Sequence, residues 1–534
     1  WDLTTEVYDT VFNENPGTNR PTQALIDRGE YITGTSVGAQ GGVGGSYFGN
    51  TFTPTGTVTI DGSQVLVSPE DEATARIYTA QLIGSHETSG GTRIVSRTYF
   101  ENGRAEKHSS YAFYSGVPRS RTLEQRIEIA REWQVGKVKH DLLGGISLRG
   151  EERLSYVDFF NEALNAFDLT LDPATFKLPA DQFFAVVPVP GRPGYFAIPG
   201  ARYPRPGGGT TTGISQTLHS QLLNAAVFLQ DSISWNERFS LLLASRWDGV
   251  KVESEDPLAP AGVTPIGDEI ETSLPVSLTA SLRWKLNRGL TTYLTLNRAA
   301  AGDGSSSSGG YGLSNNVLAE EIFENRSDLL EVGAKFTNED GSLEGSAAYY
   351  RQHRVRTNPR FAIPDEIFVR GVELAGSYRP ASWLSLSGNF FYMAANYIDG
   401  PLPFSIATAH PFDPSVPSDT FGAYEQGDYR VPGLPRWQGN LHAVATLPSG
   451  LSLRAWGGVQ GDKNVDLFGH VVIPSQFTLN LGVSYQRARW AVGADCLNAT
   501  DEFNWRTTES PFAGGDLVLR ELPRHWRVKL AYRF

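Results

Sequence analysis

The feature that most constrains this chain is the alternation of apolar and polar residues along many short segments. In residues 276–286 every second residue is apolar, and the residues between are Ser, Thr, Arg or Lys. Residues 330–337, 477–486 and 526–534 repeat the pattern. Alternate residues of a β-strand point to opposite faces, so a period of two indicates strands with one apolar and one polar face. No run of helical period competes, and the sequence predicts a nearly all-β protein.

Short turns and long segments alternate between these predicted strands. Asn, Gly, Pro and Ser supply tight-turn geometry, and short turns are expected near residues 89–91, 134–136, 236–238, 287–289, 338–342, 380–382, 449–450 and 487–488. The long Gly/Pro/Ser-rich segments are 13–72, 160–215, 252–273, 300–326, 352–365, 398–430, 461–473 and 504–520, with one shorter connection at 115–121. This alternation places all short turns at one end of about 18 antiparallel strands, as in an up-and-down barrel.

Composition excludes several classes of protein. The mean hydropathy of -0.27 and the absence of any apolar run near the ~18 residues of a spanning helix exclude a helical membrane protein. A net charge of -12 argues against a nucleic-acid partner. The single cysteine, Cys496, excludes an internal disulfide, and the nine histidines show no metal-ligand spacing. No catalytic, metal or cofactor constellation stands out, so we do not expect an enzyme.

Tryptophan placement separates a soluble β fold from a membrane barrel. Five of the 11 tryptophans adjoin short turns and would form a ring at one level: Trp133, Trp235, Trp284, Trp383 and Trp490. Trp prefers a membrane interface because its ring is apolar and its N–H seeks water or headgroups; the alternative is that these indoles plug the core of a soluble fold. Strands with an apolar face toward lipid and a polar face toward a lumen favour a transmembrane antiparallel barrel, whose sheet must close.

Several segments in the second half of the chain then resemble one family. LEVGAKF at 330–336, followed by a hairpin and AAYYR at 347–351, VRGVEL at 369–374 and LNATDEF at 497–503 are similar, in that order, to strands of TonB-dependent outer-membrane receptors. The ending, with Phe534 as a terminal aromatic, resembles the signal read by the outer-membrane assembly machinery. The chain is therefore similar to the barrel of a siderophore-receptor-like TonB-dependent receptor.

The chain also departs from that family's pattern. Members carry an N-terminal plug ahead of a barrel of about 22 strands, and no plug-like stretch occurs here. We therefore expect residues 1–534 to be one outer-membrane β-barrel domain, from which the plug and the first strands are missing. Two rivals stay open: a passive porin of about 18 strands, and a structural or adhesion barrel in an outer-membrane complex.

The resemblance implies import of a scarce nutrient across the outer membrane of a Gram-negative cell, most often a ferric siderophore. Its partners would be the lipid bilayer, the assembly machinery, a small-molecule ligand, and the TonB complex acting through a plug. Aromatic rings with Arg suit a ferric chelate or a sugar, although such side chains can also simply pack the loops together. The candidate ligand contacts are Phe184, Arg192, Tyr195, Tyr203, Tyr311, Phe412, Tyr424 and Trp505.

Overall fold

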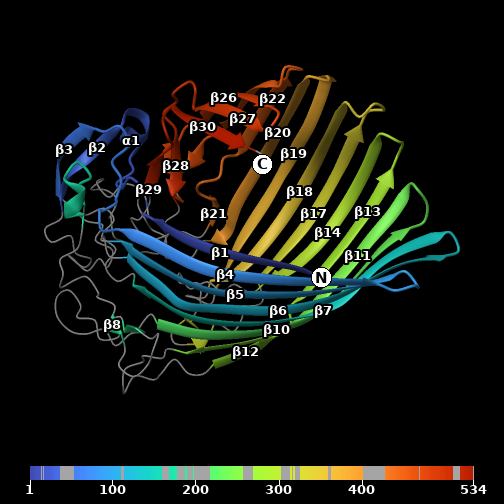
Figure 1. Cartoon of the computed structure of the whole chain (residues 1–534). Coiled ribbons are helices and arrows are strands. Elements are labelled where there is room, and N and C mark those ends of the chain that lie inside the picture. Colours follow the sequence, from blue (N-terminus) through green and yellow to red (C-terminus); the bar gives the residue numbers. More distant parts are fainter. Residues whose placement is uncertain are drawn as a thin grey trace.

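A curved wall of antiparallel strands dominates the molecule, and the strands follow one another around it in chain order (Figure 1). The computed structural model describes residues 1–13, 15, 17–35, 53–109, 113–158, 167–176, 187–188, 196–197, 217–255, 269–301, 313–314, 317–318, 325–358, 363–400, 427–467, 469–508 and 517–532. No helix among these residues is long and apolar enough to cross a membrane.

Twenty segments build the wall. They are β1 (Asp2–Phe12), β4 (Glu72–Glu87), β5 (Thr92–Ser109), β6 (Phe113–Val135), β7 (Val138–Asp158), β10 (Thr217–Ser234), β11 (Phe239–Glu255), β12 (Glu269–Ser273), β13 (Val276–Lys285), β14 (Leu290–Ala301), β17 (Asn325–Thr337), β18 (Leu343–Asn358), β19 (Ile363–Ala381), β20 (Leu384–Gly400), β21 (Gly427–Arg430), β22 (Trp437–Thr446), β23 (Leu451–Gln460), β26 (Gln476–Arg487), β27 (Trp490–Leu497) and β30 (His525–Tyr532).

The predicted strand number is confirmed once broken strands are recognised. Both β12 and β13 pair with β11, and both β21 and β22 pair with β20. The 20 segments therefore occupy 18 strand positions. Several strands, such as the 23-residue β6 and the 21-residue β7, exceed the ~9–11 residues that cross a bilayer, as expected for strands that project beyond it.

All eight predicted short turns are hairpins between consecutive strands, and they lie along one rim of the wall, at the right and the top of Figure 1. The turn between β22 and β23 shows why its glycine is needed. Gly450 has φ +90°, and a Cβ there would lie 2.3 Å from the carbonyl oxygen of Gln486. Only glycine adopts this conformation at so close an approach without strain.

The connection expected at 115–121 was wrong, because these residues belong to β6 and pair with β5 and β7. The register of β6 against β7 shifts between Gly116 and Arg119. Pro118 lies in this irregularity, and proline, which has no N–H to donate, is tolerated in strands at such bulges. A proline and a glycine in a turn-like sequence thus mark a bulge rather than a loop.

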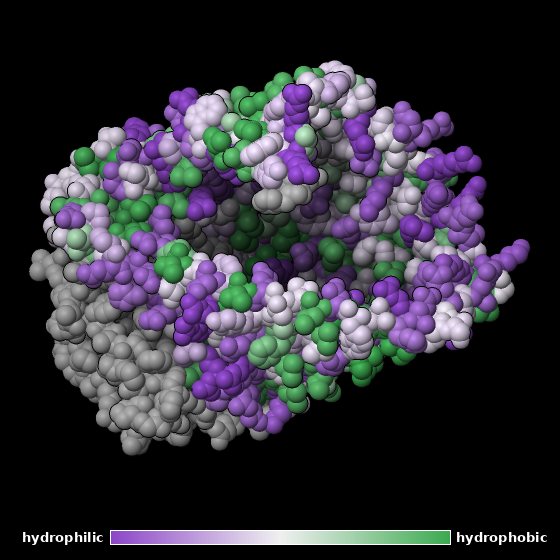
Figure 2. Space-filling view, in the orientation of Figure 1, coloured by the Kyte–Doolittle hydropathy of each residue, from purple (hydrophilic) through white to green (hydrophobic). Residues whose placement is uncertain are grey.

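The two faces of the wall differ as the alternation predicts. On β22, Leu441 is 76 % exposed on the outer face, while its neighbours Asn440 and His442 line the hollow of the inner face. Figure 2 shows this hollow at the centre of the view. An apolar exterior around a polar interior is the arrangement of a membrane barrel and the inverse of a soluble one.

The ladders run in a single series from β1 to β30. Among the described residues, β1 pairs only with β4 and β30 only with β27. The closure expected from the sequence is therefore not formed by the described strands, and the hollow opens between these two edges (Figures 1 and 2).

Smaller elements lie at the end of the wall opposite the hairpins. They are α1 (Gln23–Arg28), β2 (Glu30–Thr35), β3 (Thr53–Thr59), the 3-10 helix Pro173–Thr175, β8 (Val187–Pro188), β9 (Phe196–Ala197), β15 (Leu313–Ser314), β16 (Val317–Leu318), β24 (Lys463–Asn464), β25 (Val472–Ile473), β28 (Trp505–Thr508) and β29 (Leu517–Arg520). The sequence showed no helical period here, because α1 is only six residues long. It is capped by the Thr22 hydroxyl, which accepts from the Leu25 N–H.

Parts of the long segments share a buried hydrophobic core. We call this group the loop cluster: Leu25, Ile26, Tyr31, Ile60, Leu66, Phe167, Leu169, Phe176, Val465, Val471, Ile473, Trp505, Leu517 and Val518. Its members come from regions of the chain that the sequence describes only as Gly/Pro/Ser-rich connections. Burial of this apolar area stabilises the described connections against one another.

Candidate functional site

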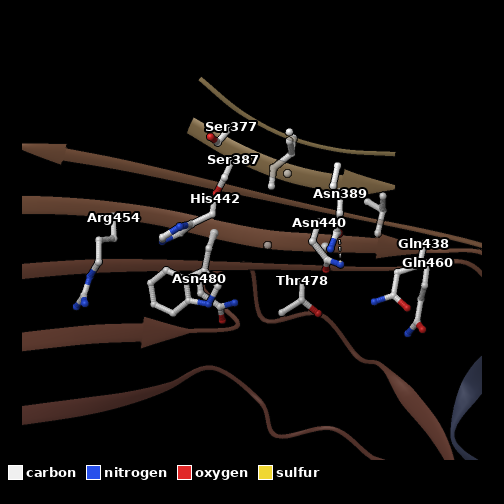
Figure 3. Close-up of a pocket in the computed structure, with 18 of the residues that line it drawn as sticks. Ser377, Ser387, Asn389, Gln438, Asn440, His442, Arg454, Gln460, Thr478 and Asn480 are labelled. Carbon is white, nitrogen blue, oxygen red and sulfur yellow. Dashed lines mark hydrogen bonds between the residues drawn. The ribbon is translucent and has the colours of Figure 1, made fainter. Parts of the chain in front are cut away.

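The candidate site is the inner face of the wall between β17 and β30, where polar side chains line a cavity of about 1070 Å³. Strand alternation brings every second residue of these strands into it. In Figure 3 these inward-facing side chains form a row, with Arg454 at one end and Gln438 and Gln460 at the other. We call the neutral part of this row the amide face: Ser377, Ser387, Asn389, Gln438, Asn440, Gln460, Gln476, Thr478 and Asn480.

Hydrogen bonds between strands orient the amide face. The Asn440 Nδ2 donates to Asn389 Oδ1 at 2.9 Å, and the Gln460 Nε2 donates to Gln476 Oε1 at 2.7 Å. Each carboxamide carries two N–H donors and one acceptor oxygen, so these pairs retain capacity for a further partner. The face therefore offers donors and acceptors side by side without net charge.

One ion cluster lies at the Arg454 end of the row (Figure 3). Asp495 accepts from Arg454 at 2.6 Å and from Arg527 at 3.0 Å, and its side chain is 4 % exposed. The space for this carboxylate exists because Gly482 faces it on β26, where a Cβ would lie 2.5 Å from Asp495 Oδ1. The cluster ties β23, β27 and β30 together on the inner side.

A second, charged sector lies on the inner face of β5, β6, β7 and β11. Its acidic groups are paired with arginines across and along the strands. The pairs are Arg97–Glu128, Arg126–Glu128, Arg149–Glu124, Arg149–Glu151 and Arg246–Asp248. Because its charges are mutually compensated, this sector favours no ion of one sign, in contrast to the neutral amide face.

Most predicted ligand contacts lie outside the described residues: Phe184, Arg192, Tyr195, Tyr203, Tyr311, Phe412 and Tyr424. Their role stays a prediction. Trp505 is described, and it lies in the loop cluster with 1 % of its surface exposed. This position gives Trp505 a packing role, and its contact with a ligand stays a prediction. The terminal Phe534 also lies outside the described residues.

The five tryptophans predicted to mark a membrane interface all lie at hairpin ends of the wall. Trp235, Trp284, Trp383 and Trp490 are between 42 % and 53 % exposed. Trp133 stacks on His140 with ring centroids 5.0 Å apart, and Trp284 stacks on Phe239 at 5.6 Å. Their role as a membrane-interface belt stays a prediction.

The sequence missed a buried polar network inside the loop cluster. Arg20 is fully buried, lies 5.5 Å from the ring centre of Tyr31, and donates to the carbonyl oxygens of Ile32 at 2.8 Å and Gly34 at 2.7 Å. The Gly34 N–H in turn donates to Asp168 at 2.7 Å. No local pattern marks Arg20, because its partners depend on how the segments pack.

Burial raises the pKa of Tyr31 to about 12 from an ordinary 10.0, while the positive charge of Arg20 opposes the shift. The neutral phenol, whose hydroxyl donates to Asn19 Oδ1 at 2.7 Å, is the form that the folded cluster holds. Stability from this group is complete below pH 10 and is lost as the pH rises from 10 toward 12. The loss is about 3 kcal/mol, from about two pKa units.

Urea unfolding of the loop cluster at pH 9 and pH 11.5 measures this loss. We expect the wild type to lose stability at the higher pH by more than the Tyr31→Phe variant, which has no phenol to ionise. An equal loss in both proteins would contradict the role of Tyr31.

Metal binding has no geometric support in the part of the chain that the structure describes, where no group of three or more His, Cys, Asp or Glu residues could hold an ion. The amide face can instead hydrogen-bond an oxygen-rich organic ligand. Neutral carboxamides and hydroxyls bind such a ligand without the desolvation cost of a buried charge.

The sequence matches the family described as "TonB dependent receptor-like, beta-barrel" over residues 8–499. A search of curated protein sequences gives no match.

Solved structures resemble the fold at low sequence identity. The ferric-catecholate import receptor Fiu of E. coli K12 is 13 % identical with a TM-score of 0.68, over 100 % of this chain and 72 % of that one. The siderophore receptor PiuA of Acinetobacter baumannii is 13 % identical with a TM-score of 0.65, over 99 % and 71 %. The ferric yersiniabactin uptake receptor FyuA of Yersinia pestis is 13 % identical with a TM-score of 0.59, over 88 % and 63 %.

Proposed function

The chain belongs to the TonB-dependent receptor-like β-barrel family, and we propose that it imports a scarce nutrient, of the ferric siderophore class, across the outer membrane. The family is one of transporters and receptors of the outer membrane rather than of enzymes. The proposal adds a cargo class and an energy source, the TonB complex, to that family assignment.

The observation that carries the proposal is the neutral amide face on the inner wall. A ferric siderophore presents many oxygen atoms around its iron, and the donors of Asn389, Asn440 and Asn480 are arranged to meet such atoms along one side of the hollow. Side-chain amides bind and release a polar cargo more easily than fixed charges do, since no ion pair must be broken.

The structural neighbours support the cargo class. Fiu is named as a ferric-catecholate import receptor, PiuA as a siderophore receptor and FyuA as a ferric yersiniabactin uptake receptor. At 12–14 % identity the structural similarity supports the fold alone, and it does not identify which siderophore is bound. The family match also favours a receptor over the passive porin and over a purely structural barrel.

Uptake of iron-55 bound to a defined siderophore tests the proposal. Cells that lack the gene are compared with complemented cells under iron limitation, using one catecholate, one hydroxamate and one carboxylate siderophore in separate arms. We expect complemented cells to take up at least one of the three, and to lose that uptake in a background without TonB.

Two results would contradict this function. Uptake that persists without TonB would indicate a passive porin. Uptake of all three chelates that is unchanged by loss of the gene would exclude an import role for them and favour a structural barrel.

A further inference from the structure

The outer face of four neighbouring strands changes from apolar to charged at one level. On β14, β17, β18 and β19 the outward residues nearest the hairpins are Leu290, Phe336, Leu343 and Tyr378, and the residues eight positions further along each strand are Arg298, Asp328, Arg351 and Arg370. Eight residues span about 26 Å along a strand and about 20 Å in height at the usual tilt. These charged residues therefore mark the edge of the outer apolar band that is farther from the hairpins.

Charge at this level is only partly compensated. Asp328 accepts from Arg298 at 2.6 Å, and His353 meets Glu366 at 2.8 Å. Arg351 and Arg370 lie directly opposite each other on β18 and β19. Like charges in opposed positions destabilise a sheet, and among the described residues neither arginine forms an ion pair.

A small pocket opens beside Arg370. Its cavity of about 230 Å³ is lined by Arg370, Arg430 and Arg436, together with Asn396 and the ring of Tyr392. Arg370, Tyr392 and Asn396 belong to the outward-facing set of β19 and β20, and Arg430 is the register partner of Asn396 on β21. The pocket is thus on the outer side of the wall, away from the amide face.

The three arginines differ in their ion pairs and hydrogen bonds. Arg430 is anchored, because it pairs with Asp462 at 2.8 Å and donates to the Leu434 carbonyl at 2.9 Å. The same pair lowers the pKa of Asp462, which keeps that carboxylate charged. Arg370 and Arg436 are exposed and form no ion pair with any described residue. Two guanidinium groups outside any direct ion pair therefore converge on one cavity in a chain whose net charge is -12. The charge of Arg436 also reaches Asp462 and helps to lower the pKa of that carboxylate.

We propose that this pocket binds the phosphate group of an anionic membrane lipid. Guanidinium groups bind phosphate oxygens through paired N–H donors, and the cavity has room for a phosphate rather than a bulky headgroup. The outward residues Val372, Leu374 and Tyr392 continue from the pocket toward the hairpins and would contact the acyl chains. This site is independent of the cargo of the receptor, since none of its residues lines the inner cavity.

A binding titration of the full chain in neutral detergent micelles tests the assignment. The probes are fluorescent phosphatidic acid and phosphatidylcholine with the same acyl chains. We expect the wild type to bind phosphatidic acid at least tenfold more tightly than phosphatidylcholine. The double variant Arg370→Gln/Arg436→Gln should lose that preference, and Arg370→Lys/Arg436→Lys, which keeps the charge but not the fork geometry, should retain part of it.

A matched control removes the same charge from the inner face. Arg283→Gln/Arg354→Gln changes two exposed arginines of β13 and β18 and should leave the preference within twofold of the wild type. The heat-dependent mobility shift of folded barrels in detergent gels verifies that each variant is folded, and the lysine variant provides the test if the glutamine variant does not fold.

Three outcomes would overturn the proposal. Equal binding of both lipids would exclude a phosphate site. An equal loss in the control variant would show only an effect of overall charge. Displacement of phosphatidic acid by inorganic phosphate at the same concentration would assign the pocket to free anions rather than to a lipid.

Discussion

Replacing Trp505 with alanine is expected to unfold the loop cluster while leaving the strand wall folded. Trp505 is the largest fully buried side chain of the described residues. It meets the ring of Phe503 edge-on, with centroids 5.4 Å apart. Removing a buried tryptophan costs about 3–5 kcal/mol, which is comparable with the whole stability of a core of this size. Hydrogen exchange should show lost protection in β2, β3 and β25 and retained protection in β18 and β19.

A second substitution at this position separates packing from polarity. The Trp505 indole Nε1 is buried without a hydrogen-bond partner, so Trp505→Phe gives up ring volume but also removes an unsatisfied donor. We expect this variant to keep most of the protection. Trp235→Ala, on the exposed outer face, is the control and should leave the loop cluster unchanged. Equal loss of protection in the cluster and in the wall would show that the two are one cooperative unit.

Replacing Asp495 with alanine is expected to destabilise the wall by about 2–3 kcal/mol. The carboxylate is buried between Arg454 and Arg527, and its loss leaves two guanidinium groups without their partner on the inner face. Breaking a buried pair costs about 3–5 kcal/mol. The loss of stability is smaller here because both arginines are partly exposed and water can hydrate their unpaired guanidinium groups. Urea unfolding in phosphatidylcholine vesicles measures the change.

A double-substitution cycle identifies the cause of that change. Adding Arg454→Met to Asp495→Ala should recover part of the lost stability, because one unpaired charge is removed. Glu132→Ala is the control, since Glu132 pairs with Lys139 at 2.9 Å on the exposed surface and such pairs contribute about 0–1 kcal/mol. A destabilisation by Glu132→Ala as large as that by Asp495→Ala would contradict the role of burial.

The wall was predictable because its determinants are local. Residues 276–286 alternate strictly and form β13, and the dipeptide at 449–450 forms the hairpin between β22 and β23. Each such strand pairs with its neighbour in the chain, so a period of two and a turn signal define both the strand and its partner. The error at 115–121 arose where Pro118 breaks the pattern inside a strand.

The candidate site was predictable only in part. The alternation places Thr478 and Asn480 on the polar face of their strand, but it does not show that Asn389 and Asn440 from two other strands join them. The amide face depends on the register of four ladders, and register is set by all the pairings together. The predicted contacts in the long segments could not be placed by any local rule.

The sequence by itself determined the strands, the hairpins, the polarity of the two faces and the family, because each depends on a pattern within a few neighbouring residues. Only the tertiary structure decided what distant residues do together. It buried Arg20 against Tyr31 and joined both to the cluster that holds Trp505. It also brought Arg370, Arg430 and Arg436 to one outward pocket. The physical reason is that a strand's period is local, whereas burial and charge pairing depend on contacts between segments far apart in the chain.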